Sequence, residues 1–345
     1  MIKNINISGF NVGGKKTFII ADIGSNHMQD LSLAKESIDA AAASGANAVK
    51  FQSIQLDKLY LSPDTETINL VKKLEFQEDW HQKLKEYCDI KSVIFFSSPT
   101  YLESVDLLEE LNVPLYKIAS AQIGTFPQIV EKIAKLNKPT IFSTGISAYD
   151  DIIKTVSIFN KHKNNNFIIL HCNSIYPTPP EKVNLNLIKT YKNMFGNPVG
   201  FSDHTNGIHI SCAAVTMGAN VIEKHFTLSR NLKSPDSNSF ASDPLEFRSL
   251  VQSIREIELA KNVSHDRMEI QVEEQIFKDS ILYRCVANKN MLAGNIIDEK
   301  NLDFLRNING LDARTFFNSP KNYILIKDIN KGELITNEVF KYEDK

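Results

Sequence analysis

Eight short apolar runs recur through about the first 260 residues, and each is followed by a polar turn and a segment of helical periodicity. The runs are rich in Ile, Val and Phe and do not alternate with polar residues, which is typical of strands buried on both faces. They cover residues 17–23, 48–51, 93–97, 115–120, 140–144, 167–172, 199–202 and 221–225.

The segments between the runs predict helices. In the first of them Ala34, Ile38 and Ala41 fall on one face, and Gly45 is placed to end the helix. Residues 52–79 are longer and less regular, and we interpret them as an insertion. Comparable helical segments cover residues 105–111, 127–136, 149–159, 185–194, 207–217 and 244–260.

The alternation of eight strands with helices predicts an α/β protein in which residues 1–262 form a closed (β/α)8 TIM barrel. An open, doubly wound sheet is the alternative, because a count of strands does not prove closure. A dinucleotide-binding sheet is disfavoured, since no Gly-x-Gly-x-x-Gly motif follows the first run.

The character of the chain changes beyond the predicted barrel. Residues 263–279 are polar and charged, and we interpret them as a linker. Residues 280–345 contain short strand-like segments separated by turn signals such as Ala293-Gly294. A domain of this size buries little core alone, so we expect it to pack on another surface.

Composition excludes several classes of function. The 39 Lys and Arg residues nearly balance the 41 Asp and Glu residues, which argues against a nucleic-acid protein with a broad basic surface. The apolar runs are far shorter than the ~20 residues of a membrane helix, and the first residues show no signal-peptide core. Four scattered cysteines without a Cys-x-x-Cys pair predict reduced thiols in a cytoplasmic protein.

Polar residues close nearly every predicted strand, at the end of the barrel where such folds carry their chemistry. Lys50 and Lys117 lie inside strand-like segments, and Ser or Thr residues stand at several strand ends. Two ammonium groups with converging hydroxyls suit a phosphate or a phospho-carboxylate ligand. The alternative for Lys117 is a pair with a local carboxylate.

Two histidines indicate a metal site. His204 and His225 are separated by 21 residues, one strand–helix unit, so they end consecutive strands about 4.8 Å apart. Both imidazoles can therefore reach one divalent cation, leaving positions open for water and substrate. A packing role is the alternative for each of them. His171 could belong to the core, and surface positions are expected for His81, His162, His209 and His265.

Several ordered motifs resemble the bacterial sialic acid (N-acetylneuraminate) synthase family, which includes the legionaminic and pseudaminic acid synthases. The C-terminal region resembles the antifreeze-like (SAF) domain of that family, with Lys331-Gly-Glu333 typical of it. The matching segments are 19–27, 45–52, 116–120, 143–145, 171–177, 200–205, 221–227 and 234–236.

The resemblance implies an enzyme that condenses phosphoenolpyruvate with an N-acyl amino hexose, giving a nine-carbon 2-keto-3-deoxy acid and phosphate. A divalent metal, Mn²⁺ or alternatively Mg²⁺ or Co²⁺, would sit on His204 and His225. Tyr176 and Asp236 would face the sugar, and Arg306 would reach the active site of the partner in a domain-swapped homodimer. The residues implied for phosphoenolpyruvate are Lys50, Ser98, Lys117, Ser120, Ser143 and Ser202.

Three positions depart from the family pattern at the implied site. Asp22 stands where the family has glutamate, and Ser174 where asparagine or threonine is common. Gln122 also replaces a glutamate, and an amide cannot accept a proton as a general base. We therefore expect Asp22, Gln122 and His225 at the catalytic positions, with Gln122 only orienting its partners. The alternatives are a ligand-binding barrel with lost or altered catalysis, and an aldolase with a Schiff-base lysine.

Overall fold

The apolar runs form one closed parallel sheet. The computed structural model describes residues 3–235, 237, 240–261 and 269–344. Its barrel strands are β3 (Phe18–Gly24), β4 (Ala48–Ser53), β5 (Ile94–Pro99), β6 (Tyr116–Ile118), β7 (Thr140–Ser143), β8 (Phe167–Cys172), β9 (Val199–Asp203) and β10 (Val221–His225). Within the described residues they pair as an eight-stranded sheet in the order β5-β4-β3-β10-β9-β8-β7-β6. Because β5 and β6 contact each other, the ring closes, and the predicted TIM barrel is confirmed.

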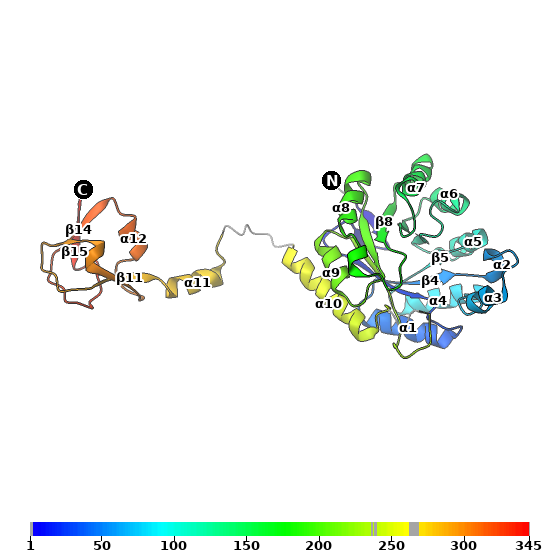
Figure 1. Cartoon of the computed structure of the whole chain (residues 1–345), viewed down its shortest axis with the longest axis horizontal. Helices are drawn as coiled ribbons and strands as arrows, with labels where there is room; N and C mark the ends of the chain where they lie inside the picture. The colour runs from blue at the N-terminus through cyan, green and yellow to red at the C-terminus, as the bar shows by residue number, and fades with distance from the viewer. Residues whose placement is uncertain (1–2, 236, 238–239, 262–268, 345) are drawn as a thin grey trace. The chain divides into compact units, whose positions relative to one another are not determined.

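Helices surround the barrel strands (Figure 1). They are α1 (Leu31–Ala43), α4 (Glu78–Ile90), α5 (Leu102–Glu110), α6 (Pro127–Lys135), α7 (Tyr149–Lys161), α8 (Asn186–Phe195), α9 (His209–Thr216) and α10 (Pro244–Lys261). Helix α1 begins where Asp30 accepts hydrogen bonds from the amides of Ser32 and Leu33, and it buries Ala34, Ile38 and Ala41 as its periodicity predicts. The insertion at 52–79 forms two short helices, α2 (Leu56–Leu59) and α3 (Thr65–Val71).

A hairpin of β1 (Ile5–Ile7) and β2 (Phe10–Val12) precedes the barrel. Its apolar side chains pack with inward-facing residues in the first half of the strands, including Phe18 and Ile20 of β3. The next inward position on β3 is Asp22, since side chains alternate along a strand. The same alternation brings Lys50 inward after Ala48. One half of the barrel interior is therefore apolar and the other half, at the carboxyl ends of the strands, is polar.

The chain divides into two compact units, Met1–Val263 and Ser264–Lys345. In the described part of the second unit, β11 (Tyr283–Ala287) pairs with β13 (Leu302–Arg306), and β14 (Lys321–Leu325) pairs with β12 (Ile296–Ile297) and β15 (Phe340–Asp344). It also contains α11 (Val272–Ser280), which lies almost wholly in the segment predicted as a linker, and α12 (Ala313–Phe317). Cys285, Tyr323 and their neighbours give it a small apolar core of its own.

Candidate active site

A pocket of about 260 Å³ lies at the carboxyl end of the barrel. Its wall is made of inward-facing side chains from most of the strands and from the loops that follow them. Nine of the residues predicted from the sequence line it: Asp22, Lys50, Lys117, Ser120, Ser143, Tyr176, Ser202, His204 and His225. Glu223, Cys172, Gln52, Ser25, Leu74, Ala119 and Pro235 complete the lining.

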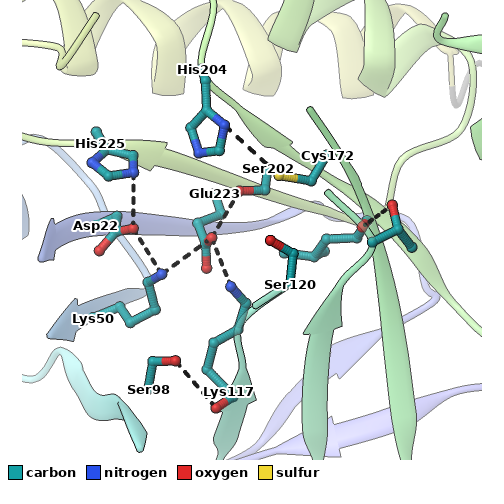
Figure 2. Close-up of polar contacts among 12 residues, drawn as sticks. Asp22, Lys50, Ser98, Lys117, Ser120, Cys172, Ser202, His204, Glu223 and His225 are labelled. Carbon is teal, nitrogen blue, oxygen red and sulfur yellow. Dashed lines mark hydrogen bonds and ion pairs between the residues drawn. The ribbon is translucent and has the colours of Figure 1, made fainter. Parts of the chain in front are cut away.

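Glu223 is the centre of the charged network in this pocket (Figure 2). Its Oε1 lies 3.1 Å from Lys117 Nζ and 3.3 Å from Lys50 Nζ, and it accepts a 2.9 Å hydrogen bond from the hydroxyl of Ser202. Lys50 Nζ also lies 2.7 Å from Asp22 Oδ2. The alternative predicted for Lys117, an ion pair with a nearby carboxylate, is therefore confirmed, with Glu223 as the partner. Lys117 also lines the pocket.

Burial and pairing set the charges of this network. Burial opposes the charge on Lys50, but Asp22 and Glu223 outweigh it and hold the pKa of Lys50 above its ordinary value. Burial lowers the pKa of Lys117, and the nearby charge of Glu223 opposes that effect. Burial alone raises the pKa of Glu223, yet Lys117 and Lys50 hold it well below its usual range. Glu223 is therefore held as an anion, and its charge favours the protonated form of both lysines.

The two predicted metal-binding histidines face each other across the mouth of the pocket. The ring centroids of His204 and His225 are 5.2 Å apart. His204 Nδ1 lies 2.6 Å from the carbonyl oxygen of Asn173, so it donates its hydrogen there and leaves the lone pair on Nε2. Burial and the nearby His225 lower the pKa of His204 to about 3, which keeps the ring neutral, as a metal ligand must be.

Few other metal-binding side chains stand beside the imidazoles. Among the described residues, no group of three or more His, Cys, Asp or Glu side chains is arranged to hold a metal ion. Asp22 Oδ2 lies 3.4 Å from His225 Nε2, and Cys172 Sγ lies 3.8 Å from His204 Nδ1. The chain can thus offer two imidazoles to a cation, and the remaining positions would be left to water or substrate oxygen atoms.

An aromatic wall covers the imidazole pair. The ring of Tyr176 lies 4.3 Å from that of His204, and the ring of Phe240 lies 4.8 Å from that of His225. Tyr176 and Phe240 also contact each other, with centroids 5.3 Å apart. Burial raises the pKa of Tyr176 to about 12, so its hydroxyl stays protonated. Of these two rings, Tyr176 lines the pocket, which therefore combines charged side chains with an aromatic surface.

Serine hydroxyls form the opposite side of the pocket. Ser120 Oγ lies 3.2 Å from Ser174 Oγ, and a Cβ at Gly145 would overlap both hydroxyls, so any larger residue there would displace them. Ser143 Oγ is buried and has no hydrogen-bond partner among the described residues. A buried hydroxyl without a partner, in the lining of a pocket, is available to a ligand.

Some predicted site residues lie elsewhere. Of those that the structure describes, Ser98, Ser174 and Gln122 do not line the pocket. Ser98 Oγ lies 3.5 Å from the carbonyl oxygen of Lys117, and Ser174 contacts two residues of the lining, Ser120 and Tyr176. Gln122 is buried in the turn after β6, where its backbone N–H donates to the carbonyl of Ala119, and its side-chain Oε1 has no partner among the described residues.

Two further predictions cannot be placed in the pocket. Asp236 lies outside the described residues. Arg306 lies on β13 in the second unit, exposed, with its guanidinium 5.5 Å from the centroid of the Tyr283 ring.

The structure also adds residues and corrects one. Glu223 and Cys172 were not assigned to the site, although strand alternation puts Glu223 on the same face of β10 as His225. The surface position predicted for His81 is wrong. Its Nε2 lies 2.7 Å from Ser53 Oγ, and Phe76 packs against its ring, because helix α4 turns this face toward the barrel.

Comparisons with known proteins place the chain among sugar acid synthases by similarity. The chain is 39% identical, over 93% of its length and 99% of the other, to an N,N'-diacetyllegionaminic acid synthase of Campylobacter jejuni. It is 38% identical to the human N-acetylneuraminate-9-phosphate synthase, over 72% of each chain.

A crystal structure of an N-acetylneuraminic acid (sialic acid) synthetase from Leptospira borgpetersenii, in complex with citrate, superposes with a TM-score of 0.74 at 36% identity. It covers 81% of this chain and 96% of that one. The model of the NeuB family matches residues 37–266, so the chain belongs to the NeuB family.

Proposed function

We propose that this protein condenses phosphoenolpyruvate with the open-chain form of an N-acyl amino hexose, giving a nine-carbon 2-keto-3-deoxy acid and phosphate. The observation that carries the proposal is the pocket itself, where buried lysines and serines lie beside two facing imidazoles. The relatives named as legionaminic and pseudaminic acid synthases support it. A barrel with lost catalysis is not favoured, because these relatives are named as synthases.

Phosphoenolpyruvate fits the lysine and serine side of the pocket. Lys50 and Lys117 supply charge, and Ser120, Ser143 and Ser202 supply directed hydroxyls for the phosphate and carboxylate oxygens. The two lysines are balanced by Asp22 and Glu223, whereas phosphoenolpyruvate carries nearly three negative charges at neutral pH. Further positive charge is therefore needed when the ligand is bound.

A divalent cation on His204 and His225 is a source of that charge, and we propose Mn²⁺, with Mg²⁺ or Co²⁺ as alternatives. The donor set fits such an ion, since both rings face one space and the backbone bond from His204 Nδ1 leaves Nε2 for a ligand. When bound, the ion supplies Lewis acidity that polarises the aldehyde of the sugar.

The reaction forms one carbon–carbon bond, and at C2 it replaces the carbon–oxygen bond to phosphate by one to water. C3 of phosphoenolpyruvate attacks the aldehyde carbon, and the aldehyde oxygen takes up a proton to become a hydroxyl. Water adds at the cationic C2 and gives up one proton, and phosphate then leaves by C2–O cleavage, taking up the proton that the C2 hydroxyl loses as the ketone forms. Lys50 and Lys117 hold the phosphate and carboxylate throughout and balance the charge that develops on the departing phosphate.

Asp22 is the residue that we propose for proton transfer. One oxygen contacts Lys50 and His225, and the other, Oδ1, is buried and has no hydrogen-bond partner among the described residues. The carboxylate therefore lies in the pocket with a lone pair available to water or to the new hydroxyl. Gln122 cannot serve in this way, because it is an amide and does not line the pocket.

The second unit completes the proposal. We propose that it is an antifreeze-like (SAF) domain and that the enzyme is a homodimer in which Arg306 of one chain serves the active site of the other. The 99% coverage of the legionaminic acid synthase supports a shared two-unit organisation.

We also propose that the enzyme works in the cytoplasm. The support is that the four cysteines, all in the described residues, are free, as is usual in reducing compartments. No helix in the described part of the chain is long and apolar enough to cross a membrane.

The test is phosphate release from phosphoenolpyruvate in the presence of a panel of N-acyl hexosamines. Release that depends on both the sugar and a divalent cation is expected, and Lys50→Met should abolish most of it. Binding of phosphoenolpyruvate without release for any sugar would favour a barrel with lost catalysis. Borohydride trapping of substrate on Lys50 or Lys117 would favour the aldolase instead.

A further inference from the structure

A further buried ion pair of the barrel lies outside the pocket lining, between residues that are next to the two histidines in the sequence. We propose that this pair, Asp203 and Lys224, is a positioning device that sets the orientation of His204. The inference rests on the proposed function, because it concerns one of the two residues to which that function gives the metal. It adds two residues that neither the sequence motifs nor the pocket geometry assigned to the chemistry.

Strand alternation places the pair on the outer face of the barrel wall. On β9 and its extension, Ser202 and His204 line the pocket, so the intervening Asp203 points outward. On β10, Glu223 and His225 line the pocket, and Lys224 points outward. Asp203 and Lys224 are direct partners in the parallel ladder between the two strands. In the sequence, Asp203 immediately precedes His204, and Lys224 immediately precedes His225.

The contacts of the pair join the ends of the two strands. Lys224 Nζ lies 3.2 Å from Asp203 Oδ2, and both side chains are fully buried. Lys224 Nζ also donates a 2.8 Å hydrogen bond to the carbonyl of Thr205. Asp203 Oδ1 accepts from the amide of Thr205 at 2.8 Å and from its hydroxyl at 2.7 Å. Because Asp203 and Thr205 flank His204, the pair holds the backbone on both sides of this imidazole.

A further hydrogen bond connects the pair to the next helix. Ser211, near the start of α9, donates a 2.6 Å hydrogen bond to Asp203 Oδ2. The chain from Asp203 to Ser211 is thus held at both ends by one carboxylate, and each oxygen of that carboxylate accepts two hydrogen bonds. The loop that carries His204 consequently has little freedom to turn the ring away from His225.

Stability alone does not account for such a pair. Burying two charges costs about as much as their attraction returns, and replacing a buried pair by apolar side chains of similar volume is often neutral or stabilising. Positioning is a better reason, since the bonds of this pair run to the neighbours of His204. Residues that orient metal ligands typically change metal affinity about 10–100-fold when they are replaced.

The test uses a double variant, Asp203→Leu with Lys224→Met, which removes both charges together and also removes the acceptor of the Thr205 and Ser211 hydrogen bonds. The matched control is Arg255→Met with Glu258→Gln, which removes another ion pair, of 2.7 Å, on helix α10. Urea unfolding should show both double variants folded. Mn²⁺ affinity of the substrate-free protein, measured by electron paramagnetic resonance, should fall at least about tenfold in the first variant and stay unchanged in the control.

Nitrogen NMR of the histidine rings in the metal-free protein provides a second readout. In the wild type the His204 signals should report hydrogen on Nδ1, and in the double variant they should report a mixture of tautomers. The value of kcat should fall while KM for phosphoenolpyruvate changes less, since Lys50 and Lys117 lie on other strands. If the wild type binds no Mn²⁺, the proposed metal is wrong, and the NMR comparison alone decides whether the pair positions His204.

Unchanged ring signals, Mn²⁺ affinity and kcat in the folded double variant would overturn the inference. Should that variant fail to fold, Ser211→Ala carries the test, because it deletes one donor to Asp203 and leaves both charges in place. A measurable loss of Mn²⁺ affinity or a change in the His204 ring signals is then expected. Wild-type values for both in Ser211→Ala would reject the positioning role.

Discussion

Glu223→Gln tests the electrostatics of the pocket most sharply, because Glu223 is the shared counter-ion of two buried lysines. Its Oε1 lies 3.1 Å from Lys117 Nζ and 3.3 Å from Lys50 Nζ. At an effective dielectric constant of about 20, one contact at that distance corresponds to about 5 kcal/mol. That is large beside the 1.4 kcal/mol that changes an ionisation equilibrium tenfold.

The two lysines should respond differently to this substitution. Lys50 keeps Asp22 at 2.7 Å, so it stays charged. Lys117 loses its closest carboxylate, while burial and the charge of Lys50 continue to lower its pKa. We therefore expect Lys117 to lose its proton at a lower pH in the variant than in the wild type. The affinity for phosphoenolpyruvate should then fall as the pH rises, because the neutral amine no longer attracts the anion.

The assay is titration calorimetry with phosphoenolpyruvate between pH 7 and 9.5, together with urea unfolding to confirm that the variant is folded. Glu109→Gln is the matched control, because Glu109 makes a similar 3.0 Å ion pair with Lys138 but lies on the surface. Its affinity profile should follow that of the wild type. Parallel pH profiles for Glu223→Gln and the wild type would refute the assigned role of Glu223.

Four further outcomes follow from the same geometry. Lys50→Met should weaken phosphoenolpyruvate binding at least about tenfold in calorimetry, since it removes a charge-assisted contact; unchanged binding would reject the assignment. Asp22→Asn should lower kcat by about 10²–10⁴, and Gln122→Ala should change it far less; the reverse order would return proton transfer to Gln122. Gly145→Ala should weaken phosphoenolpyruvate binding, because the new methyl displaces Ser120; wild-type binding would contradict that contact. Burial lowers the pKa of His27 and His81 to about 4, below the 6.5 of an unfolded chain. The free energy of unfolding should therefore decrease as the pH falls below about 6.5, by up to about 1.4 kcal/mol per pH unit for each histidine. Urea unfolding at several pH values checks this, and the same pH dependence of the free energy of unfolding in His81→Gln as in the wild type would contradict it.

Much of the barrel could be predicted from the sequence because its strands are buried on both faces and its helices have one apolar face. Alternation then explains why Lys50 and Lys117 face the interior, as predicted. The same alternation could have identified Glu223, two residues before His225. The ion pair of Lys117 with Glu223 joins strands that are far apart in the sequence. No short-range sequence pattern marks such a pair, so the sequence could not show that Glu223 is the partner of Lys117.

The remaining differences arise where backbone turns decide the direction of a side chain. Gln122 follows a strand end at the expected spacing, but the turn after β6 brings Ser120 to the pocket and leaves Gln122 outside its lining. His81 lies in a polar segment and yet is buried, because a serine on the outer face of β4, Ser53, provides its partner. Propensity and periodicity describe a residue's own element, whereas these outcomes depend on contacts between elements.

The central claim is that the pocket joins C3 of phosphoenolpyruvate to the aldehyde carbon of an amino sugar. Its most direct test is mass spectrometry and carbon NMR of the product formed from phosphoenolpyruvate labelled with ¹³C at C3, a divalent cation and a panel of N-acyl hexosamines. The account predicts a nine-carbon 2-keto acid with the label at its C3 methylene for at least one sugar, together with one equivalent of phosphate. Labelled pyruvate as the only product, with every sugar recovered unchanged, would contradict it.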